Sequence, residues 1–370
     1  MSIFSSDKTR YKMNQVFWIA LAWTLVGTLD ALFIHFLLTD NIFISPTELY
    51  RFIPNLVVNS VSGFIGGFAA GYILVFYVRD AFRDRSYGWY LLLNSAVICL
   101  LIFLFSFITN DLFQSYRLGL NPFHPEVLSA TKERMFNLIF VRTVILWFIV
   151  LNGTLLALNI NDKYGPGIFM KFLLGRYHHP REEERIFMFL DMNHSTTIAE
   201  EIGHIKYYTL LNSVFADITD AILSHAGEIY QYVGDEVVIS WTRKNGLRNA
   251  NCINCYFGIL EALASKAGKY TKQFGLVPEF KAGLHYGDVT TGEVGIIKKD
   301  LVFTGDVLNT TARIRTKCTE FGVNLLVSDK LLNSLRLPPH SFVSRKIGTF
   351  ELKGKSELVT VHTIEGAMRF

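Results

Sequence analysis

Four long apolar runs occupy the first 160 residues of this 370-residue chain. They are Val16–Leu38, Ile53–Val78, Trp89–Thr109 and Leu138–Ile160. Each is close to the ~20 residues that a helix needs to cross the hydrocarbon core of a bilayer. Each is also apolar almost all round, unlike the amphipathic helices of a soluble bundle, and the first is too long for a cleaved signal peptide. The pattern predicts four membrane-spanning helices.

The composition is typical of a chain with two unlike parts. The whole chain is 50% hydrophobic and 18% charged, with a mean hydropathy of +0.29, whereas a soluble domain has about a quarter charged residues. A net charge of +4 is mild and indicates no nucleic-acid partner. We therefore expect a transmembrane domain at 1–160, a linker at 161–181 and a soluble domain at 182–370.

Basic residues flank the predicted spans on one side. Lys8, Arg10 and Lys12 precede the first span, and the segments after the second and fourth spans are also basic. Because Lys and Arg concentrate in cytoplasmic loops, both termini and the soluble domain are expected in the cytoplasm. The prediction is a multi-pass protein of the inner (plasma) membrane, with the lipid bilayer as one partner. The segment 110–137 is expected outside although it holds three basic residues.

The predicted spans contain small and ionisable residues that need an explanation. Gly63, Gly67 and Gly71 lie four residues apart, so they share one helix face and permit close helix contact, either within the chain or between two copies. Ionisable side chains are costly in lipid and are expected to face the bundle interior, as buried polar partners or in a sensing or ion-linked role, or to snorkel to the membrane surface. These side chains are Asp30, His35 and Arg142.

The rest of the chain alternates strand and helix patterns. Strands are expected at Arg185–Met192, Glu228–Val233, Glu236–Trp241 and Phe280–Tyr286, with one helix ending near His225 and another across Leu247–Phe274. Further strands are expected at Leu301–Thr304, Leu325–Ser328, Phe342–Leu352 and Val359–Ile364, with helices at Asp306–Glu320 and Asp329–Leu335. The order is a ferredoxin-like split βαβ with C-terminal additions. The predicted fold is an α-helical four-span domain followed by an α+β domain with helices on one face of its sheet.

Two carboxylates stand where a metal site would need them. Asp191 ends the first strand, and Asp235 lies in the Gly234-Asp235 turn of the hairpin. The first strand of a split βαβ sheet lies beside that hairpin, so the two side chains are expected to meet. The turn at Met192–Thr197 leads into a helix N-terminus, which offers free N–H groups to an anion. Two carboxylates with phosphate oxygens suit Mg²⁺, so the pattern indicates phosphoryl transfer.

Five segments carry a resemblance to a known family. They resemble, in the same order, the blocks of a class III adenylate or guanylate cyclase catalytic domain, and together they cover essentially all of 182–370. They are FLDMNHSTTIAEEIG (189–203), YQYVGDEVVISW (230–241), FKAGLHYGDVTTGEVG (280–295), TGDVLNTTARI (304–314) and ELKGKSELVTVHTIE (351–365). The soluble part thus looks like a class III cyclase domain behind a four-span bacterial membrane anchor.

The resemblance implies a role for each matching residue. Asp191 and Asp235, with the carbonyl of Met192, would hold two Mg²⁺ or Mn²⁺ ions per site. The phosphates of a nucleoside triphosphate would bind a group of four residues. These are Ser195, Thr196, Thr197 and Lys353.

The resemblance also implies the reaction and the assembly. Asn309 would orient the ribose, and Arg313 would stabilise the charge on the transferring phosphorus. The 3′-hydroxyl would attack the α-phosphate, giving a 3′,5′-cyclic nucleotide and pyrophosphate. In this family the metal aspartates and the Asn/Arg pair come from different protomers, which implies a homodimer with shared sites.

The base-reading positions fit neither known pattern. Adenylate cyclases usually have Lys at the position of Gln231 and Asp, Thr or Ser at that of Val302, and guanylate cyclases usually have Glu and Cys. A glutamine amide both donates and accepts, and valine does neither. Family frequency favours ATP. The alternatives are a cyclase for GTP or a pyrimidine nucleotide, and a membrane receptor whose cyclase-like domain binds nucleotide without catalysis.

Overall fold

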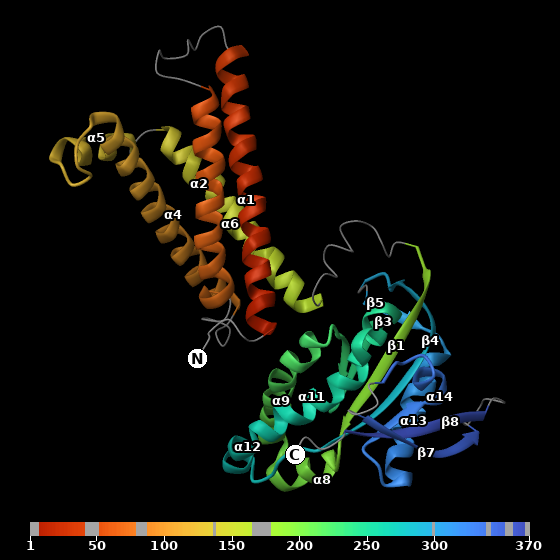
Figure 1. Ribbon diagram of the computed structural model, residues 1–370. Coiled ribbons are helices and arrows are strands. Elements are labelled where there is room, and N and C mark those ends of the chain that lie inside the picture. Colours follow the sequence, from red (N-terminus) through yellow and green to blue (C-terminus); the bar gives the residue numbers. More distant parts are fainter. Residues whose placement is uncertain are drawn as a thin grey trace. The chain divides into compact units, whose positions relative to one another are not determined.

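The structure is a computed structural model that describes residues 7–40, 52–78, 87–135, 138–164, 179–297, 300–337, 342–351 and 358–366. The chain divides into two compact units, essentially Thr9–Lys163 and Tyr164–Phe370, which are coloured red to yellow and green to blue in Figure 1. The division falls at the start of the segment expected to be the linker. The first four residues of that segment, 161–164, continue the preceding helix.

The first unit is helical. Its main helices are α1 (Asp7–Asp40), α2 (Phe52–Ile73) with the π-helical turn η1 (Leu74–Val78), α4 (Tyr87–Leu118) and α6 (Leu138–Tyr164). Four stretches within these helices are long and apolar enough to cross a membrane, so the four apolar helices expected from the sequence are confirmed. A shorter helix, α5 (Pro125–Met135), lies between α4 and α6.

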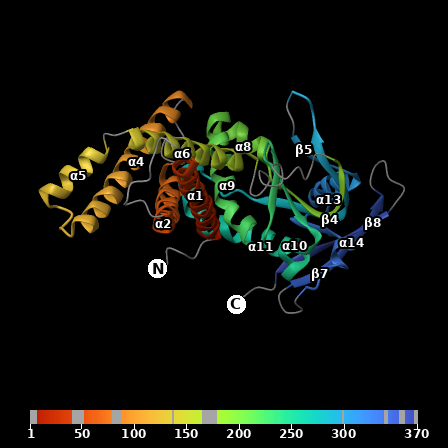
Figure 2. The ribbon, with the colours of Figure 1, turned by 90° about the horizontal axis from the view of Figure 1, so that it is seen from above.

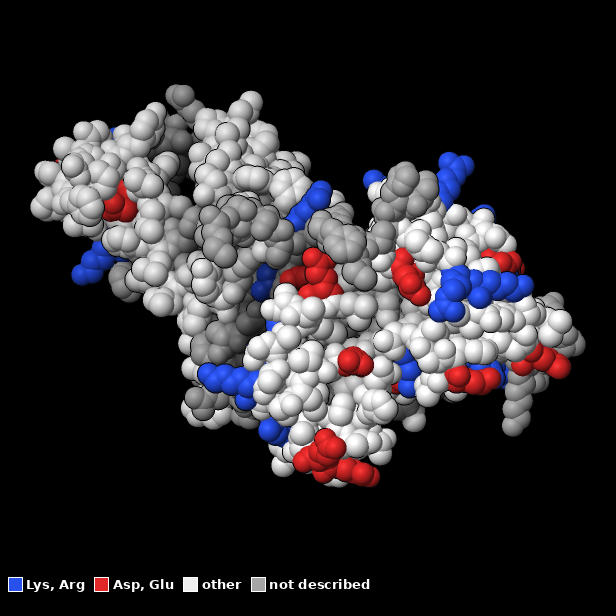
Figure 3. All heavy atoms as spheres, turned by 60° about the horizontal axis from the view of Figure 1, so that its bottom comes forward, with Lys and Arg blue, Asp and Glu red and all other residues white. Residues whose placement is uncertain are grey.

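Charged side chains are distributed unevenly between the two units. On the face shown in Figure 3, Lys, Arg, Asp and Glu gather over the C-terminal unit, and the helical unit is mostly uncharged. Many large apolar side chains of the helical unit point outward; for example, Trp18 is 63% and Ile53 69% exposed. An apolar exterior of this kind is what a lipid environment favours.

The glycines of α2 pack against α1 of the same chain. A Cβ atom on Gly63 would lie 2.7 Å from the carbonyl oxygen of Trp23, and one on Gly67 would lie 2.9 Å from the Cα atom of Ala20. Of the two uses left open by the sequence, close contact within the chain is therefore the one that the structure shows.

The ionisable residues of the spans also meet within this unit. Arg142 on α6 forms an ion pair with Asp30 on α1, with 3.4 Å between Nη1 and Oδ2. His35 stacks on Phe52 with 4.0 Å between ring centroids. Asp30 is thus partnered by an opposite charge, as the cost of burying a lone carboxylate requires.

The second unit is built on one mixed sheet. The strand order is β2-β3-β1-β4-β6-β8-β7, and β5 pairs with β4 outside this path. The strands are β1 (Arg181–Met192), β2 (Glu228–Val233), β3 (Glu236–Thr242), β4 (Phe280–Val294), β5 (Asp300–Thr304), β6 (Leu325–Ser328), β7 (Phe342–Glu351) and β8 (Leu358–Gly366). Every expected strand is present, and the split βαβ core is confirmed, with β1 antiparallel to both β3 and β4.

The helices of this unit are shorter than the sequence pattern suggests. The helix expected to end near His225 is broken at Gly203, where φ is +82°. The helix expected over 247–274 is divided near Lys266. The resulting helices are α8 (Ser195–Ile202), α9 (His204–Ser224), α10 (Arg243–Leu247), η2 (Arg248–Ala250), α11 (Asn251–Ser265), α12 (Ala267–Phe274), α13 (Asp306–Phe321) and α14 (Asp329–Leu332).

Helices cover both faces of the sheet, not one face as expected. Helices α9 and α11 lie on one face, and α13 lies on the other (Figures 1 and 2). The reason is in β1, where Met188 points into the main core with α9 and α11 while Phe187 and Phe189 point the other way, toward Val307 of α13. A strand that is apolar on both faces must be covered on both.

The contact between α1 and α2 gives a testable prediction. In the full chain reconstituted in bicelles, we expect Gly63→Ala to lower the free energy of unfolding of the helical unit by about 1–3 kcal/mol, because the added methyl group meets backbone atoms that cannot move aside. Unfolding by SDS, followed by circular dichroism, measures the change. Gly153→Ala on α6 is the matched control, since its Cβ would have no neighbour within 4 Å. Equal midpoints for the two variants would contradict the packing described here.

Candidate functional site

A row of charged side chains crosses the sheet at the end of β1. The strand register places Asp191 opposite Glu236 of β3 on one side and opposite Lys281 of β4 on the other. Neighbours in register point to the same face, and this is the face that α13 covers. The exposed fractions of the Asp191 and Lys281 side chains are 13% and 18%, so the row is largely shielded from water.

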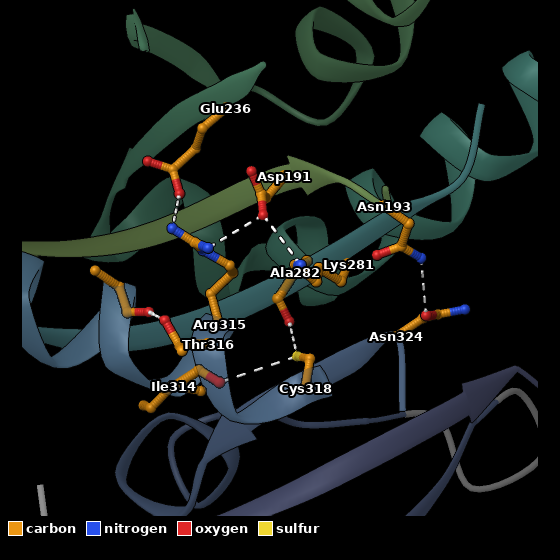
Figure 4. Close-up of polar contacts among 11 residues, drawn as sticks. Asp191, Asn193, Glu236, Lys281, Ala282, Ile314, Arg315, Thr316, Cys318 and Asn324 are labelled. Carbon is orange, nitrogen blue, oxygen red and sulfur yellow. Dashed lines mark hydrogen bonds and ion pairs between the residues drawn. The ribbon is translucent and has the colours of Figure 1, made fainter. Parts of the chain in front are cut away.

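A second cation reaches this row from α13. Nη1 of Arg315 donates to Oδ2 of Asp191 at 3.1 Å, and Nη2 lies 2.8 Å from Oε2 of Glu236. Nζ of Lys281 lies 3.3 Å from the same Asp191 oxygen. Figure 4 shows Arg315 between the two carboxylates, with Lys281 on the far side of Asp191.

Asp235 is close enough to act on this row electrostatically. Burial raises the pKa of Asp191, Arg315 and Lys281 lower it, and the charge of Asp235 raises it, with a net upward shift. Burial also raises the pKa of Glu236 in spite of Arg315. The strand register agrees with this proximity, because Asp191 pairs with Glu236, the residue directly after Asp235.

The start of α8 lies beside these carboxylates. Ser195 is the first residue of α8, preceded by His194 in the left-handed conformation with φ +56°. Burial, followed by the charge of Asp235, raises the pKa of Tyr207 on the neighbouring helix α9. Thr196 and Thr197 continue the first turn and are exposed. The free N–H groups of this turn thus lie near the aspartate pair.

The donor set fits a divalent cation of the Mg²⁺ type. Asp191 and Asp235 supply carboxylate oxygens, and the pKa of Asp191 is raised first by burial and then by the charge of Asp235, both of which a bound cation would offset. Within the described ranges, no group of three or more His, Cys, Asp or Glu side chains could hold a metal by itself. Mg²⁺ commonly takes one or two carboxylates and completes its shell with water and substrate phosphates.

Asn309 and Arg313 face away from these carboxylates. At about 100° per residue, they lie ~40° apart on α13, and Arg315 lies ~200° beyond Arg313. Since Arg315 points at Asp191 of its own chain, Asn309 and Arg313 point away from that carboxylate. Asn309 is exposed and Arg313 is half-buried.

The strands that hold Gln231 and Val302, the two positions predicted to read the base, come into contact. Tyr230 of β2 and Phe303 of β5 have ring centroids 4.8 Å apart, and the backbone N–H of Phe303 donates to the hydroxyl of Tyr230 at 3.3 Å. Gln231 and Val302 are the neighbours of these residues in sequence; Gln231 is exposed and Val302 half-buried. Lys353 lies outside the described residues, and Met192 ends β1 with a buried side chain.

Three charged residues of the site were not found from the sequence. Lys281 and Glu236 lie at the ends of apolar strands, and their place in those strands was a usable signal. Arg315 had no such signal, because its partner Asp191 is 124 residues away and the pairing depends on how α13 crosses the sheet.

Comparison with known proteins places these features in a family. The family model described as the adenylate and guanylate cyclase catalytic domain matches residues 178–366. Adenylate cyclase 2 of Rhizobium meliloti (strain 1021) is 35% identical over 219 residues, which are 59% of this chain and 60% of that protein. Retinal guanylyl cyclase 1 of Rattus norvegicus is 29% identical over 178 residues, which are 47% of this chain and 16% of that protein. The chain thus spans less than two thirds of the length of these curated relatives.

Solved structures agree on the fold. A bacterial light-regulated adenylyl cyclase matches with a TM-score of 0.52 at 21% identity, covering 63% of this chain and 67% of that chain. At this identity the likeness establishes a cyclase fold and no more.

The position of α13 depends on Gly283 of β4. A Cβ atom there would lie 2.8 Å from both the Cα atom of Arg315 and the carbonyl oxygen of Thr311. We expect Gly283→Ala to force α13 off the sheet at a cost of about 1–3 kcal/mol. Hydrogen exchange of the α13 amides in the reconstituted full chain should then rise roughly tenfold or more.

Gly268→Ala on α12 is the matched control for that measurement, because its Cβ would have no neighbour within 4 Å. Unchanged exchange in α13 of the Gly283→Ala variant would show that this close contact does not hold the helix.

Proposed function

The chain belongs to the family of the adenylate and guanylate cyclase catalytic domain, and we propose that it is a membrane-anchored adenylate cyclase. The reaction is attack of the ribose 3′-hydroxyl of ATP on the α-phosphate, which closes 3′,5′-cyclic AMP and releases pyrophosphate. The observation that carries the proposal is that Asp191, at the end of β1 and shortly before the start of α8, pairs in register with Glu236, the residue directly after Asp235.

The aspartates and the helix start bind the polyphosphate end of the substrate. Asp191, Asp235 and the carbonyl of Met192 would hold Mg²⁺ or Mn²⁺, two per site, which would activate the 3′-hydroxyl and offset charge on the phosphates. The N–H groups and hydroxyls of Ser195, Thr196 and Thr197 bind the β- and γ-phosphates, as helix N-termini do. Lys281 adds positive charge beside Asp191. Lys353 is proposed as a further phosphate ligand.

The geometry of α13 supports a homodimer with shared sites. Asn309 and Arg313 are the residues proposed to orient the ribose and to stabilise charge on the transferring phosphorus. Because they face away from Asp191 of their own chain, they serve the carboxylates of a second copy. A two-fold dimer of this kind has two equivalent sites, each with aspartates from one protomer and Asn309 and Arg313 from its partner.

We propose ATP as the substrate. The R. meliloti adenylate cyclase is 35% identical over 219 residues, against 29% over 178 residues for the rat guanylyl cyclase. Gln231 and Val302 match the usual residues of neither class. Because only Gln231 offers hydrogen bonds, discrimination between bases is expected to be modest. GTP or a pyrimidine nucleotide is the second candidate.

The four apolar helices support a membrane anchor. Their length and outward apolar side chains fit a bilayer, and the basic flank at Lys8, Arg10 and Lys12 favours a cytoplasmic N-terminus. An even number of spans then places the cyclase domain in the cytoplasm as well. In this proposal the spans hold the catalytic domains at the membrane, where two copies can pair.

The nucleotide proposal is tested by offering ATP, GTP, CTP and UTP separately with Mn²⁺ to the purified full chain and identifying products by mass. We expect cyclic AMP to be the main product, with less than about 100-fold preference over the next base. Asp191→Asn is expected to lower the rate by about 100-fold or more, since it removes a ligand of the charge-stabilising ions. If another cyclic nucleotide is the main product, its triphosphate and not ATP is the preferred substrate. If wild type and Asp191→Asn form equally little product with every nucleotide, the domain binds nucleotide without catalysis.

The shared site is tested by co-expressing Asp191→Asn and Arg313→Ala chains with different tags and isolating the mixed dimers. Each variant alone should be inactive, and each mixed dimer should have one intact site, so about half of the wild-type activity is expected. The matched control combines Asp191→Asn with Asp235→Asn, a pair that leaves no intact site. Failure of the first pair to recover more activity than the second would rule out shared sites.

A further inference from the structure

Helix α13 directs one cation into the carboxylates of its own chain. Arg315 is 24% exposed and contacts two carboxylates, Oδ2 of Asp191 at 3.1 Å and Oε2 of Glu236 at 2.8 Å. The proposed reaction uses Asn309 and Arg313 of this helix toward a second copy and gives Arg315 no part. The proposed reaction therefore does not explain why Arg315 contacts Asp191 and Glu236.

The backbone of α13 holds Arg315 at this point. The helix approaches β4 so closely at Gly283 that a Cβ atom there would overlap Arg315 itself. One turn further on, Sγ of Cys318 lies 3.4 Å from the carbonyl oxygen of Ala282, to which it donates, as drawn in Figure 4. The guanidinium thus extends from an anchored Cα atom to the nearby carboxylates of Asp191 and Glu236.

The two cations contact the same oxygen of Asp191. Both Arg315 and Lys281 bind Oδ2. The row and its neighbour Asp235 contain three carboxylates and two cations, so one negative charge remains. A divalent ion held by Asp191 must share that carboxylate with a fixed positive charge, which opposes its binding.

We propose that Arg315 is a positioning residue that sets the affinity of the site for divalent cations. It holds Asp191 through Oδ2, leaves Oδ1 as the oxygen for the ion, and keeps the affinity low. Glu236 moderates this effect, because it neutralises part of the guanidinium charge. The inference rests on the proposed function, since it takes Asp191 as a metal ligand.

The test measures binding of Mn²⁺ alone to the full chain in nanodiscs, by the electron paramagnetic resonance signal of free Mn²⁺. Removing the opposing charge with Arg315→Gln should tighten binding by about tenfold. Arg315→Lys keeps the charge but cannot contact both carboxylates as the guanidinium does, so its affinity should lie nearer to that of wild type than to that of Arg315→Gln. Glu236→Gln removes the moderating charge and should weaken binding several-fold, by roughly three- to tenfold. The double variant Arg315→Gln/Glu236→Gln should bind more weakly than Arg315→Gln and more tightly than Glu236→Gln.

The matched control is Lys317→Gln on the same helix, where Lys317 pairs with Glu320 outside the site; its affinity should not change. The proposal is overturned if Arg315→Gln weakens or does not change Mn²⁺ binding, or if Arg315→Lys behaves like Arg315→Gln. If Arg315→Gln does not fold, Glu236→Gln is the deciding variant. Unchanged or tighter Mn²⁺ binding by Glu236→Gln then overturns the proposal.

Asp191→Asn separates this inference from the proposed function. If this variant does not bind Mn²⁺ while the Arg315 and Glu236 variants have the Mn²⁺ affinity of wild type, the metal site is supported and the role of Arg315 is wrong. If Asp191→Asn binds Mn²⁺ as wild type does, both fall.

Discussion

The close approach of α13 to β4 at Gly283 is the contact on which the rest of the site depends. Only a residue without a Cβ atom lets the helix backbone lie against the strand there. That contact fixes the rotation of α13 about its axis. One face then presents Arg315 to Asp191, and the opposite face presents Asn309 and Arg313 outward. A helix held less closely could rotate, and Arg315 would then not be fixed toward Asp191 with Asn309 and Arg313 on the other side.

The charges around Asp191 follow from that arrangement. Register alone brings Glu236 and Lys281 beside Asp191, and the helix adds Arg315. In a half-buried site this balance matters, because burial penalises each unpaired charge and strengthens each interaction between charges. The upward shift in the pKa of Asp191, in spite of two neighbouring cations, shows how strongly burial acts there.

Prediction from sequence succeeded where the signal is local. The four apolar helices follow from continuous runs of hydrophobic residues, and the strands follow from short apolar segments between turn residues. That Asp191 and Asp235 lie near each other was also predictable, because Asp191 is next to the last residue of a strand and Asp235 sits in the adjacent turn of the split βαβ order. Their role as metal ligands stays a prediction. The uninterrupted helix expected before His225 was wrong, since Gly203 adopts a positive φ that ends α8. The expectation of helices on one face was also wrong, because Phe187 and Phe189 need cover on the second face.

The amino-acid sequence by itself determined the two-part organisation, the order of helices and strands along the chain, and the cyclase family. All of these depend on residue patterns that are close together in the chain. Only the tertiary structure decided that the α2 glycines pack on α1, that Asp30 pairs with Arg142, and that Arg315 occupies one oxygen of Asp191. These contacts join residues far apart in sequence, and the packing of one backbone against another selects them. No local sequence pattern specifies how closely two backbones pack.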